Sequence, residues 1–169
     1  MRYAQIRSMD ISNGEGIGVS LFVQGCDKEP HCKNCFNQST WDFTGGKEWT
    51  EETKKKFFDL ISKPYISRIS ILGGEPLSFV NVIPIANLCS EIRNKFPNKK
   101  IWLYTGYTFE NLGRHQMRAV YCADILVDGS YIDELKDPRL AYRGSSNQRV
   151  IDLNETFRQN MRKVVLYCD

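Results

Sequence analysis

Histidine is scarce in this sequence, and no serine, histidine and aspartate pattern accompanies the two that are present, His31 and His115. Hydrolysis by a catalytic triad is therefore not indicated. A strong excess of charge is also missing, because the formal net charge is only +3. An excess this small does not predict a nucleic acid as the partner.

Long apolar runs are absent as well, so the sequence predicts no membrane-spanning segment. The first residues lack the apolar core of a signal peptide, and we therefore expect a cytoplasmic protein. We find no internal repeat, low-complexity tract or linker. With 169 residues, the chain is expected to form one domain over residues 1–169.

Cysteine, in contrast, is concentrated in one place. Cys26, Cys32 and Cys35 fall within ten residues, and thiolates this close together bind soft metals or oxidise. In a reducing compartment the metal is the better explanation. The other three cysteines are dispersed and are expected to be structural: Cys89 on an apolar helix stripe, and the isolated Cys122 and Cys168.

Three sulfur donors are one fewer than a closed zinc site or a fully ligated iron–sulfur cluster takes from protein. In one alternative, His31 completes a zinc site in a non-catalytic binding module. In the other, one iron of a cluster remains open for another ligand. Adjacent residues such as His31 and Cys32 rarely reach the same tetrahedral ion, and a second Cys-x-x-Cys pair is absent. We therefore favour the open cluster and expect His31 to be a solvated loop residue.

Strand-like and helix-like patterns alternate along the chain, which is typical of parallel βα units. Apolar runs predict strands at 18–24, 66–72, 100–104, 124–128, 148–152 and 163–167, and amphipathic patterns predict helices after Thr50, across 85–96 and across 109–120. The chain is too short for eight βα units of roughly 30 residues each. We expect an α/β fold, an open, partial (βα) barrel of five or six mainly parallel strands.

The loops that follow the first four of these strands carry the unusual residues: the cysteines, Gly73-Gly74-Glu75-Pro76, Tyr104-Thr105-Gly106-Tyr107 and Asp128-Gly129. Ligands sit at the carboxyl ends of parallel strands, so these loops are expected to converge on one site. Two glycines at a strand end allow a ligand to approach the backbone closely. By contrast, the glycine-rich stretch 13–18 precedes a strand and no helix, so it is interpreted as a turn and not as a phosphate loop.

With these motifs the chain resembles the radical S-adenosylmethionine (SAM) enzymes. Within them it is similar to the activating proteins of anaerobic (class III) ribonucleoside-triphosphate reductase. The cysteine loop and Gly-Gly-Glu-Pro carry the wider resemblance. The narrower one rests on stretches spread over most of the chain: 10–14, 21–26, 32–41, 101–107, 126–129 and 142–148.

The resemblance implies a 4Fe-4S cluster on Cys26, Cys32 and Cys35, with SAM at the fourth iron. It implies further that residues of the strand-end loops bind the cofactors: Asn34 and Phe36 near the adenosine of SAM with Cys35 between them, Gly73, Gly74 and Glu75 at the amino-acid end, and Tyr104, Thr105 and Asp128 along the pocket. No catalytic residue beyond the cluster and SAM is implied, in agreement with the scarcity of histidine.

The implied activity is reductive cleavage of SAM to methionine and a 5′-deoxyadenosyl radical. That radical takes a hydrogen atom from a glycine on the large subunit of the reductase, and flavodoxin or a similar protein supplies the electron. Activation of another glycyl-radical enzyme is the nearest alternative. The sequence departs from the family at two places: five residues separate Cys26 and Cys32 where three are usual, and Asn34 stands where glycine is common.

Overall fold

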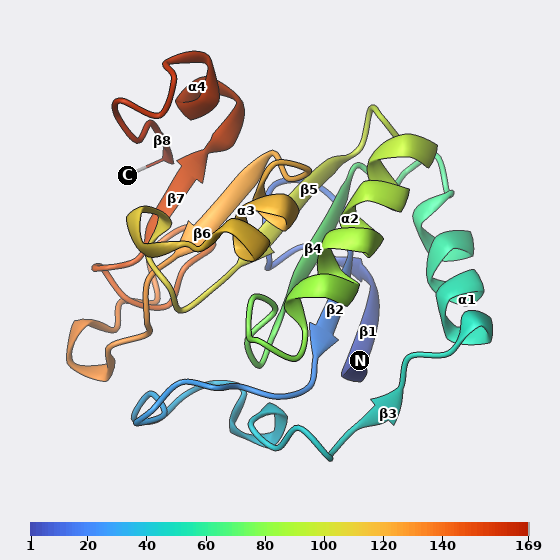
Figure 1. The fold of residues 1–169 in the computed structure, drawn as a ribbon, viewed down its shortest axis with the longest axis horizontal. Coiled ribbons are helices and arrows are strands. Elements are labelled where there is room, and N and C mark those ends of the chain that lie inside the picture. The colour runs from blue at the N-terminus through green and yellow to red at the C-terminus, as the bar shows by residue number, and fades with distance from the viewer. Residues whose placement is uncertain (169) are drawn as a thin grey trace.

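The computed structural model describes residues 1–168. They form one mixed sheet with helices packed on it (Figure 1). The strands are β1 (Arg2–Asp10), β2 (Gly18–Val23), β3 (Lys47–Glu48), β4 (Arg68–Gly73), β5 (Lys100–Tyr104), β6 (Ile125–Asp128), β7 (Arg149–Asp152) and β8 (Leu166–Cys168). The helices are α1 (Glu51–Ile61), α2 (Val82–Lys95), α3 (Arg114–Val120) and α4 (Leu153–Arg158), with 3₁₀ turns η1 (Gln38–Thr40), η2 (Phe109–Asn111) and η3 (Asp133–Leu135).

The sheet has the strand order β3-β1-β2-β4-β5-β6-β7-β8. The four central strands β2, β4, β5 and β6 are parallel neighbours, whereas every pairing outside them is antiparallel. The carboxyl ends of β2, β4, β5 and β6 therefore lie along the same edge. This is the arrangement that brings their four following loops together.

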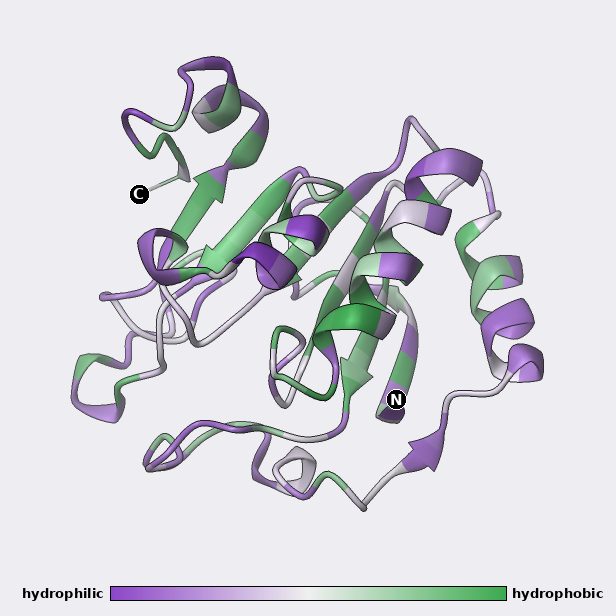
Figure 2. Cartoon of the chain, in the orientation of Figure 1, coloured by the Kyte–Doolittle hydropathy of each residue, from purple (hydrophilic) through white to green (hydrophobic). Residues whose placement is uncertain are grey.

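Alternation along the central strands gives the sheet two different faces. One face packs beneath the helices and is apolar: Val19, Leu21 and Val23 of β2, Ile69 and Ile71 of β4, Ile101 and Leu103 of β5, and Leu126 of β6. The opposite face carries Phe22, Leu72, Tyr104 and Val127, which line a cavity. In Figure 2 the central strands are mostly green, whereas α1 and α3 carry purple, hydrophilic turns. The two faces thus separate the hydrophobic core from the cavity.

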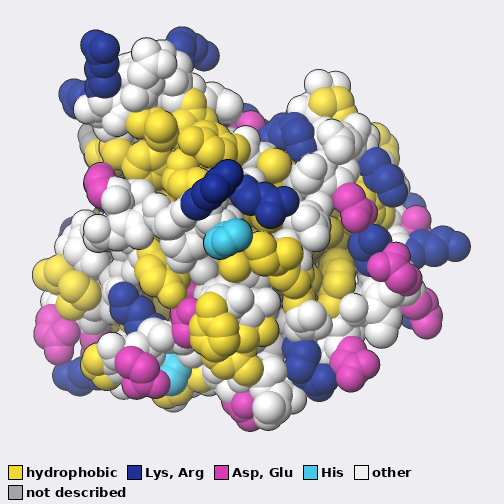
Figure 3. Space-filling view, viewed as in Figure 1, with side chains coloured by type: hydrophobic (Ala, Val, Ile, Leu, Met, Phe, Trp, Pro, Cys, Tyr) yellow, Lys and Arg dark blue, Asp and Glu magenta, His cyan; other side chains and the backbone are white. Residues whose placement is uncertain are grey.

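Local signals explain where the helices begin. The hydroxyl of Thr50 accepts a hydrogen bond from the backbone N–H of Thr53, which caps α1 as the sequence predicts. Lys54 and Lys56 form ion pairs with acidic neighbours on the solvent side of α1, and Figure 3 shows basic and acidic side chains side by side on this face. None of the helices in residues 1–168 is both long and apolar enough to cross a membrane.

The predicted strands all occur, and the helical pattern across 85–96 forms most of α2. The pattern across 109–120 is divided, because η2 and α3 are separated by Leu112 and Gly113. The sequence missed β1, β3 and α4. The sheet has eight strands where five or six mainly parallel ones were expected, and only three of its seven strand pairings are parallel. Its description as part of a barrel stays a prediction.

Candidate functional site

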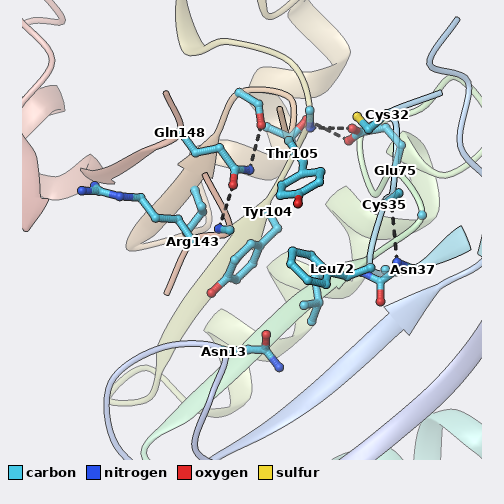
Figure 4. A pocket seen from close by; sticks show the side chains of 18 of the residues that line it. Asn13, Cys32, Cys35, Asn37, Leu72, Glu75, Tyr104, Thr105, Arg143 and Gln148 are labelled. Atoms are coloured by element: carbon cyan, nitrogen blue, oxygen red, sulfur yellow. Dashed lines mark hydrogen bonds between the residues drawn. The ribbon is translucent and has the colours of Figure 1, made fainter. Parts of the chain in front are cut away.

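The cavity on the strand-end side of the sheet has a volume of about 570 Å³. Its wall is built by the segments that follow β2, β4, β5 and β6, together with β1 and residues 136–148 (Figure 4). Cys26, Cys32 and Cys35 all line it, and so does the Gly73-Gly74-Glu75 loop. The convergence of loops expected from the sequence is therefore found.

The two ends of the cysteine loop are hydrogen-bonded to each other directly after β2. The backbone N–H of Gly25 donates to the carbonyl of Thr40 over 2.7 Å, and that of Cys26 donates to Trp41 over 3.0 Å. Between these ends the three thiols are half-buried, and none forms a disulfide within residues 1–168. Burial raises the pKa of the Cys26 thiol to about 11, and burial also raises the pKa of Cys32. Metal binding at these thiols would thus release protons.

His31 is not among the residues that line the cavity. The imidazole stacks on Trp41 with the ring centres 4.2 Å apart, and its Nε2 lies 3.3 Å from the carbonyl oxygen of Cys26. In the described chain, moreover, no three His, Cys, Asp or Glu side chains lie close enough to hold a single metal ion. This arrangement does not provide the zinc site of Cys26, Cys32, Cys35 and His31.

A cluster of several irons needs a different arrangement of ligands. Each cysteine binds a different iron, so the three sulfurs do not have to lie within bonding distance of one metal ion. Cys26, Cys32 and Cys35 are half-buried and line one cavity, so they bring three sulfur donors of the kind that an iron–sulfur cluster takes from protein to the same space.

The Gly-Gly-Glu-Pro loop is pressed against the backbone of β2 and the cysteine loop. A Cβ on Gly73, whose φ is +118°, would lie 2.6 Å from backbone atoms of Val23, and one on Gly74 would lie 2.3 Å from the carbonyl oxygen of Gly25. Only glycine permits this approach. The amide of Asn81 completes the loop by donating to the carbonyls of Gln24 and Glu75.

Glu75 is 3% exposed and connects two of the loops. Its carboxylate accepts hydrogen bonds from the backbone N–H of Leu77, the hydroxyl of Thr105 and the backbone N–H of Gly106, at 2.7 to 2.9 Å. Burial nevertheless raises the pKa of Glu75 to about 7. This side chain holds the loop in shape and has no oxygen without a protein donor.

Most of the other expected site residues also reach the cavity. Phe36, Tyr104 and Thr105 line it, and the hydroxyl of Tyr104 is buried without a hydrogen-bond partner in the described chain. Asn34 does not line the cavity, and its amide instead donates to Asp133. Asn34 has a φ of +53°, a left-handed conformation that asparagine tolerates better than most residues. The backbone conformation explains how asparagine can replace glycine here.

Asp128 requires a correction. Val127 faces the cavity, so the next side chain of β6 points to the other face of the sheet. There the Asp128 carboxylate accepts hydrogen bonds from the backbone N–H of Phe109 and from the guanidinium of Arg149. Asp128 is fully buried, and it supports the loop architecture without lining the cavity.

Several lining residues escaped the sequence analysis. Arg7 reaches the cavity from β1, where its guanidinium lies 4.4 Å from the ring centre of Phe22. Asn13 lines it from the turn before β2, and the cavity-lining Gln148 is held by hydrogen bonds to Gly129 and Gly144. The stretch 142–148 was quoted for its resemblance but was given no role, and nothing in the local sequence marks Arg7.

Comparison with known proteins agrees with this geometry. The family described as a 4Fe-4S single cluster domain matches residues 12–151, a range that includes the cysteine loop. The anaerobic ribonucleoside-triphosphate reductase-activating protein of Salmonella typhi is 43% identical over 152 residues, covering 89% of this chain and 97% of the relative.

Proteins of the same name show similar agreement in other organisms. That of Escherichia coli (strain K12) is 41% identical over 89% of this chain and 97% of its own length. That of Enterobacteria phage T4 is 40% identical over 89% of this chain and 93% of its own length. The similarity extends over nearly the whole of each relative. The chain therefore belongs to the family of anaerobic ribonucleoside-triphosphate reductase-activating proteins.

Proposed function

We propose that this protein is a radical SAM activase that produces a glycyl radical on the large subunit of anaerobic ribonucleoside-triphosphate reductase. The observation that carries the proposal is the meeting of two loops on one cavity, in a chain 41–43% identical to activating proteins. One loop supplies three thiols and no histidine ligand. The other presents a glycine backbone to the same space.

Cys26, Cys32 and Cys35 would hold a 4Fe-4S cluster, and an open iron would take the amino and carboxylate groups of SAM. When bound, the pair supplies one-electron reductive cleavage of the sulfonium–carbon bond, which gives methionine and a hydrogen-atom acceptor at the 5′ carbon. Flavodoxin or a similar one-electron donor would supply the electron. The glycine of the partner would give its Cα hydrogen atom to this acceptor and would so become the radical.

The chain's own residues bind and orient the reactants. Gly73 and Gly74 pack against the backbones of β2 and the cysteine loop and also line the cavity, where their backbone would meet the amino-acid end of SAM. Glu75 fixes their loop to Thr105 and Gly106. Lys28 lines the cavity and its ammonium reaches the carbonyl of Gly106 at 3.4 Å. A cation at this position would offset the negative charge that three thiolates bring to the site.

The cavity has the size of a cofactor site. Its volume of about 570 Å³ lies within the range that small-molecule ligands such as SAM occupy. The partial barrel belongs to the same proposal, because an open barrel leaves the mouth accessible to a protein loop.

The test begins with iron, sulfide and zinc analysis of protein purified without oxygen. Iron and sulfide near four each per chain support the proposal, whereas tightly bound zinc in a colourless protein overturns it. The loaded protein is then incubated with SAM, dithionite and the reductase large subunit, and electron paramagnetic resonance is used to look for the glycyl radical.

A second glycyl-radical enzyme incubated in parallel distinguishes the substrate. A radical on the reductase alone is the expected result. A radical only on the other enzyme keeps the chemistry but overturns the assigned partner. Cys32→Ser is the negative control in both incubations.

A further inference from the structure

The part of the cysteine loop that bears two of the thiols is attached to the sheet by few backbone contacts. We call residues 32–36 the thiol arm. Within the described chain, the only backbone hydrogen bond donated by residues 27–36 is the local one from Cys35 to Cys32, at 3.2 Å. The position of the arm must therefore depend on its side chains.

Those side chains meet a second segment, residues 131–136, which we call the wall segment. The amide of Asn34 donates to Oδ2 of Asp133 over 2.7 Å, and the ammonium of Lys33 lies 3.0 Å from Oε1 of Glu134. The Phe36 ring packs against Tyr131, with the ring centres 4.9 Å apart. Arm and wall are about 100 residues apart in sequence, so these contacts are tertiary.

Asp133 contacts both the polar and the aromatic side chains that connect the thiol arm to the wall segment. Its Oδ1 accepts a hydrogen bond from the phenol of Tyr131 over 2.7 Å while Oδ2 holds Asn34. Tyr131 in turn supports Phe36, and both rings line the cavity. One carboxylate therefore fixes the arm through Asn34 and fixes the ring against which the arm packs.

The backbone at residue 34 is left-handed, and the side chain that stands there also makes a contact. A glycine at position 34 would satisfy the left-handed backbone but could not reach Asp133. Asn34 satisfies the same φ of +53° and adds the hydrogen bond.

We propose that Asp133 is a positioning residue that, through Asn34 and Tyr131, holds the thiol arm so that Cys32 and Cys35 face the cavity. The inference rests on the proposed function only where it assigns these thiols to a cluster. The ion pair of Lys33 and Glu134 has a minor part, because both side chains are about two-thirds exposed and such pairs contribute little.

Hydrogen–deuterium exchange of the metal-free protein tests the contact itself. Asn34→Gly keeps the backbone conformation and removes the amide, and Asp133→Ala removes its acceptor. Each is expected to speed exchange in residues 32–37, at the hydrogen-bonded amides of Cys35 and Asn37, by about three- to tenfold, the effect of losing a net hydrogen bond. The double variant should add little to either single one.

The matched control is Asn160→Gly. Asn160 has the same φ of +53° and is exposed in the C-terminal part of the chain. The Asn160→Gly variant should leave exchange in residues 32–37 unchanged. Glu134→Ala should change that exchange by no more than about twofold. Equal exchange in wild type, Asn34→Gly and Asp133→Ala would overturn the proposal.

A reciprocal exchange separates positioning from general destabilisation. Asn34→Asp alone places two carboxylates together and should loosen the arm. Combined with Asp133→Asn, it restores one donor and one acceptor, so protection of residues 32–37 should return. Failure of the combined variant to recover, with an unchanged urea midpoint, would contradict the assigned contact.

Loaded protein provides the final readout. The rate at which an iron chelator removes the cluster should rise about three- to tenfold in Asn34→Gly and Asp133→Ala and return in the exchanged pair. If wild type binds no iron, the proposed function fails, while the exchange measurements on metal-free protein still decide the role of Asp133.

Discussion

The hydroxyl of Thr105 donates a hydrogen bond to Oε1 of the buried Glu75 over 2.8 Å, and so it joins the loop after β5 to the loop after β4. The neighbouring backbone N–H of Gly106 binds the other carboxylate oxygen at 2.7 Å. Two loops that must present their backbones to one ligand are thereby held at a fixed separation. Because Glu75 is buried at this junction, its ionisation is expected to make the stability of the protein depend on pH.

The stability of the metal-free protein should fall as the pH rises toward 7. Burial raises the pKa of Glu75 from 4.5 to about 7, so the folded state favours the protonated acid. The stabilisation that comes from protonating Glu75 in the folded state is complete below pH 4.5, and it is lost as the pH rises through about 7. At about 1.4 kcal/mol per pH unit, the interval limits the loss to about 3 kcal/mol.

Urea unfolding of wild type and Glu75→Gln from pH 5 to pH 8 measures this effect. The glutamine cannot ionise, so its curve should lack the decline. The glutamine amide also points an N–H group at one of the groups that donate a hydrogen bond to Glu75. Because two donors then face each other, the free energy of unfolding should fall by about 1–3 kcal/mol at low pH. Parallel curves for the two proteins would show that Glu75 does not titrate in this range.

Gly74→Ala should disrupt the loop that it occupies. A Cβ there would lie 2.3 Å from the carbonyl oxygen of Gly25 and 2.8 Å from that of Thr40, and backbone atoms cannot rotate away. We expect a loss of stability of about 3 kcal/mol or more, or failure to fold.

Gly113→Ala is the control, because the nearest atom to its Cβ would be 3.7 Å away. Thermal unfolding of the two variants measures the difference. A Gly74→Ala protein as stable as Gly113→Ala would show that the loop can move away from the cysteine loop.

Cys32→Ser should lose the cluster but keep the fold. Cys32 is half-buried in a loop, and serine replaces it there without creating a cavity. We expect iron and sulfide to drop to background while the circular dichroism spectrum and urea midpoint stay near those of wild-type metal-free protein. Iron retained at the wild-type level would exclude Cys32 as a ligand.

Cys89→Ser should show the opposite pattern. Cys89 is completely buried in the core beneath α2, where a hydroxyl without a partner costs about 1–3 kcal/mol. Stability should fall by this amount, and iron content should not change. A loss of iron without a loss of stability would contradict the structural role of Cys89.

The sequence predicted the central strands well because they are buried and form continuous apolar runs. It missed β1, whose residues are mostly half-exposed and mixed in polarity, because that strand is defined by its pairing with β2 and β3. The two-residue β3 exists only through that pairing. Such elements depend on tertiary register, which a local pattern does not contain.

The site was predictable to the level of loops and not of single side chains. Chain order and parallel pairing place the four loops together whatever their details. The direction of each side chain depends on its register, so Asp128 faces away from the cavity while Val127 faces it. Arg7 reaches the cavity only because β1 lies beside β2.

The last prediction concerns Arg68, whose guanidinium is completely buried beneath the turn between β1 and β2. It donates to the carbonyls of Asn13 and Glu15, at 2.7 and 3.3 Å, and lies 3.6 Å from the carboxylate of Asp10. Because Asn13 lines the cavity, this buried cation also supports part of the ligand site.

Arg68→Leu should lower the free energy of unfolding by about 3–5 kcal/mol, because it leaves the buried Asp10 carboxylate without its counter-ion and the carbonyls of Asn13 and Glu15 without this donor. Asp10→Asn added to Arg68→Leu should recover part of the loss, since the unpaired charge is removed.

Arg139→Leu is the control. It breaks an exposed ion pair with Asp137 and should lower the free energy of unfolding by less than about 1 kcal/mol. Urea unfolding at low and high salt measures all three, and the Arg68 effect should hardly change with salt because the pair is buried. A loss at Arg68 no larger than that at Arg139 would mean that the turn is held by its backbone alone.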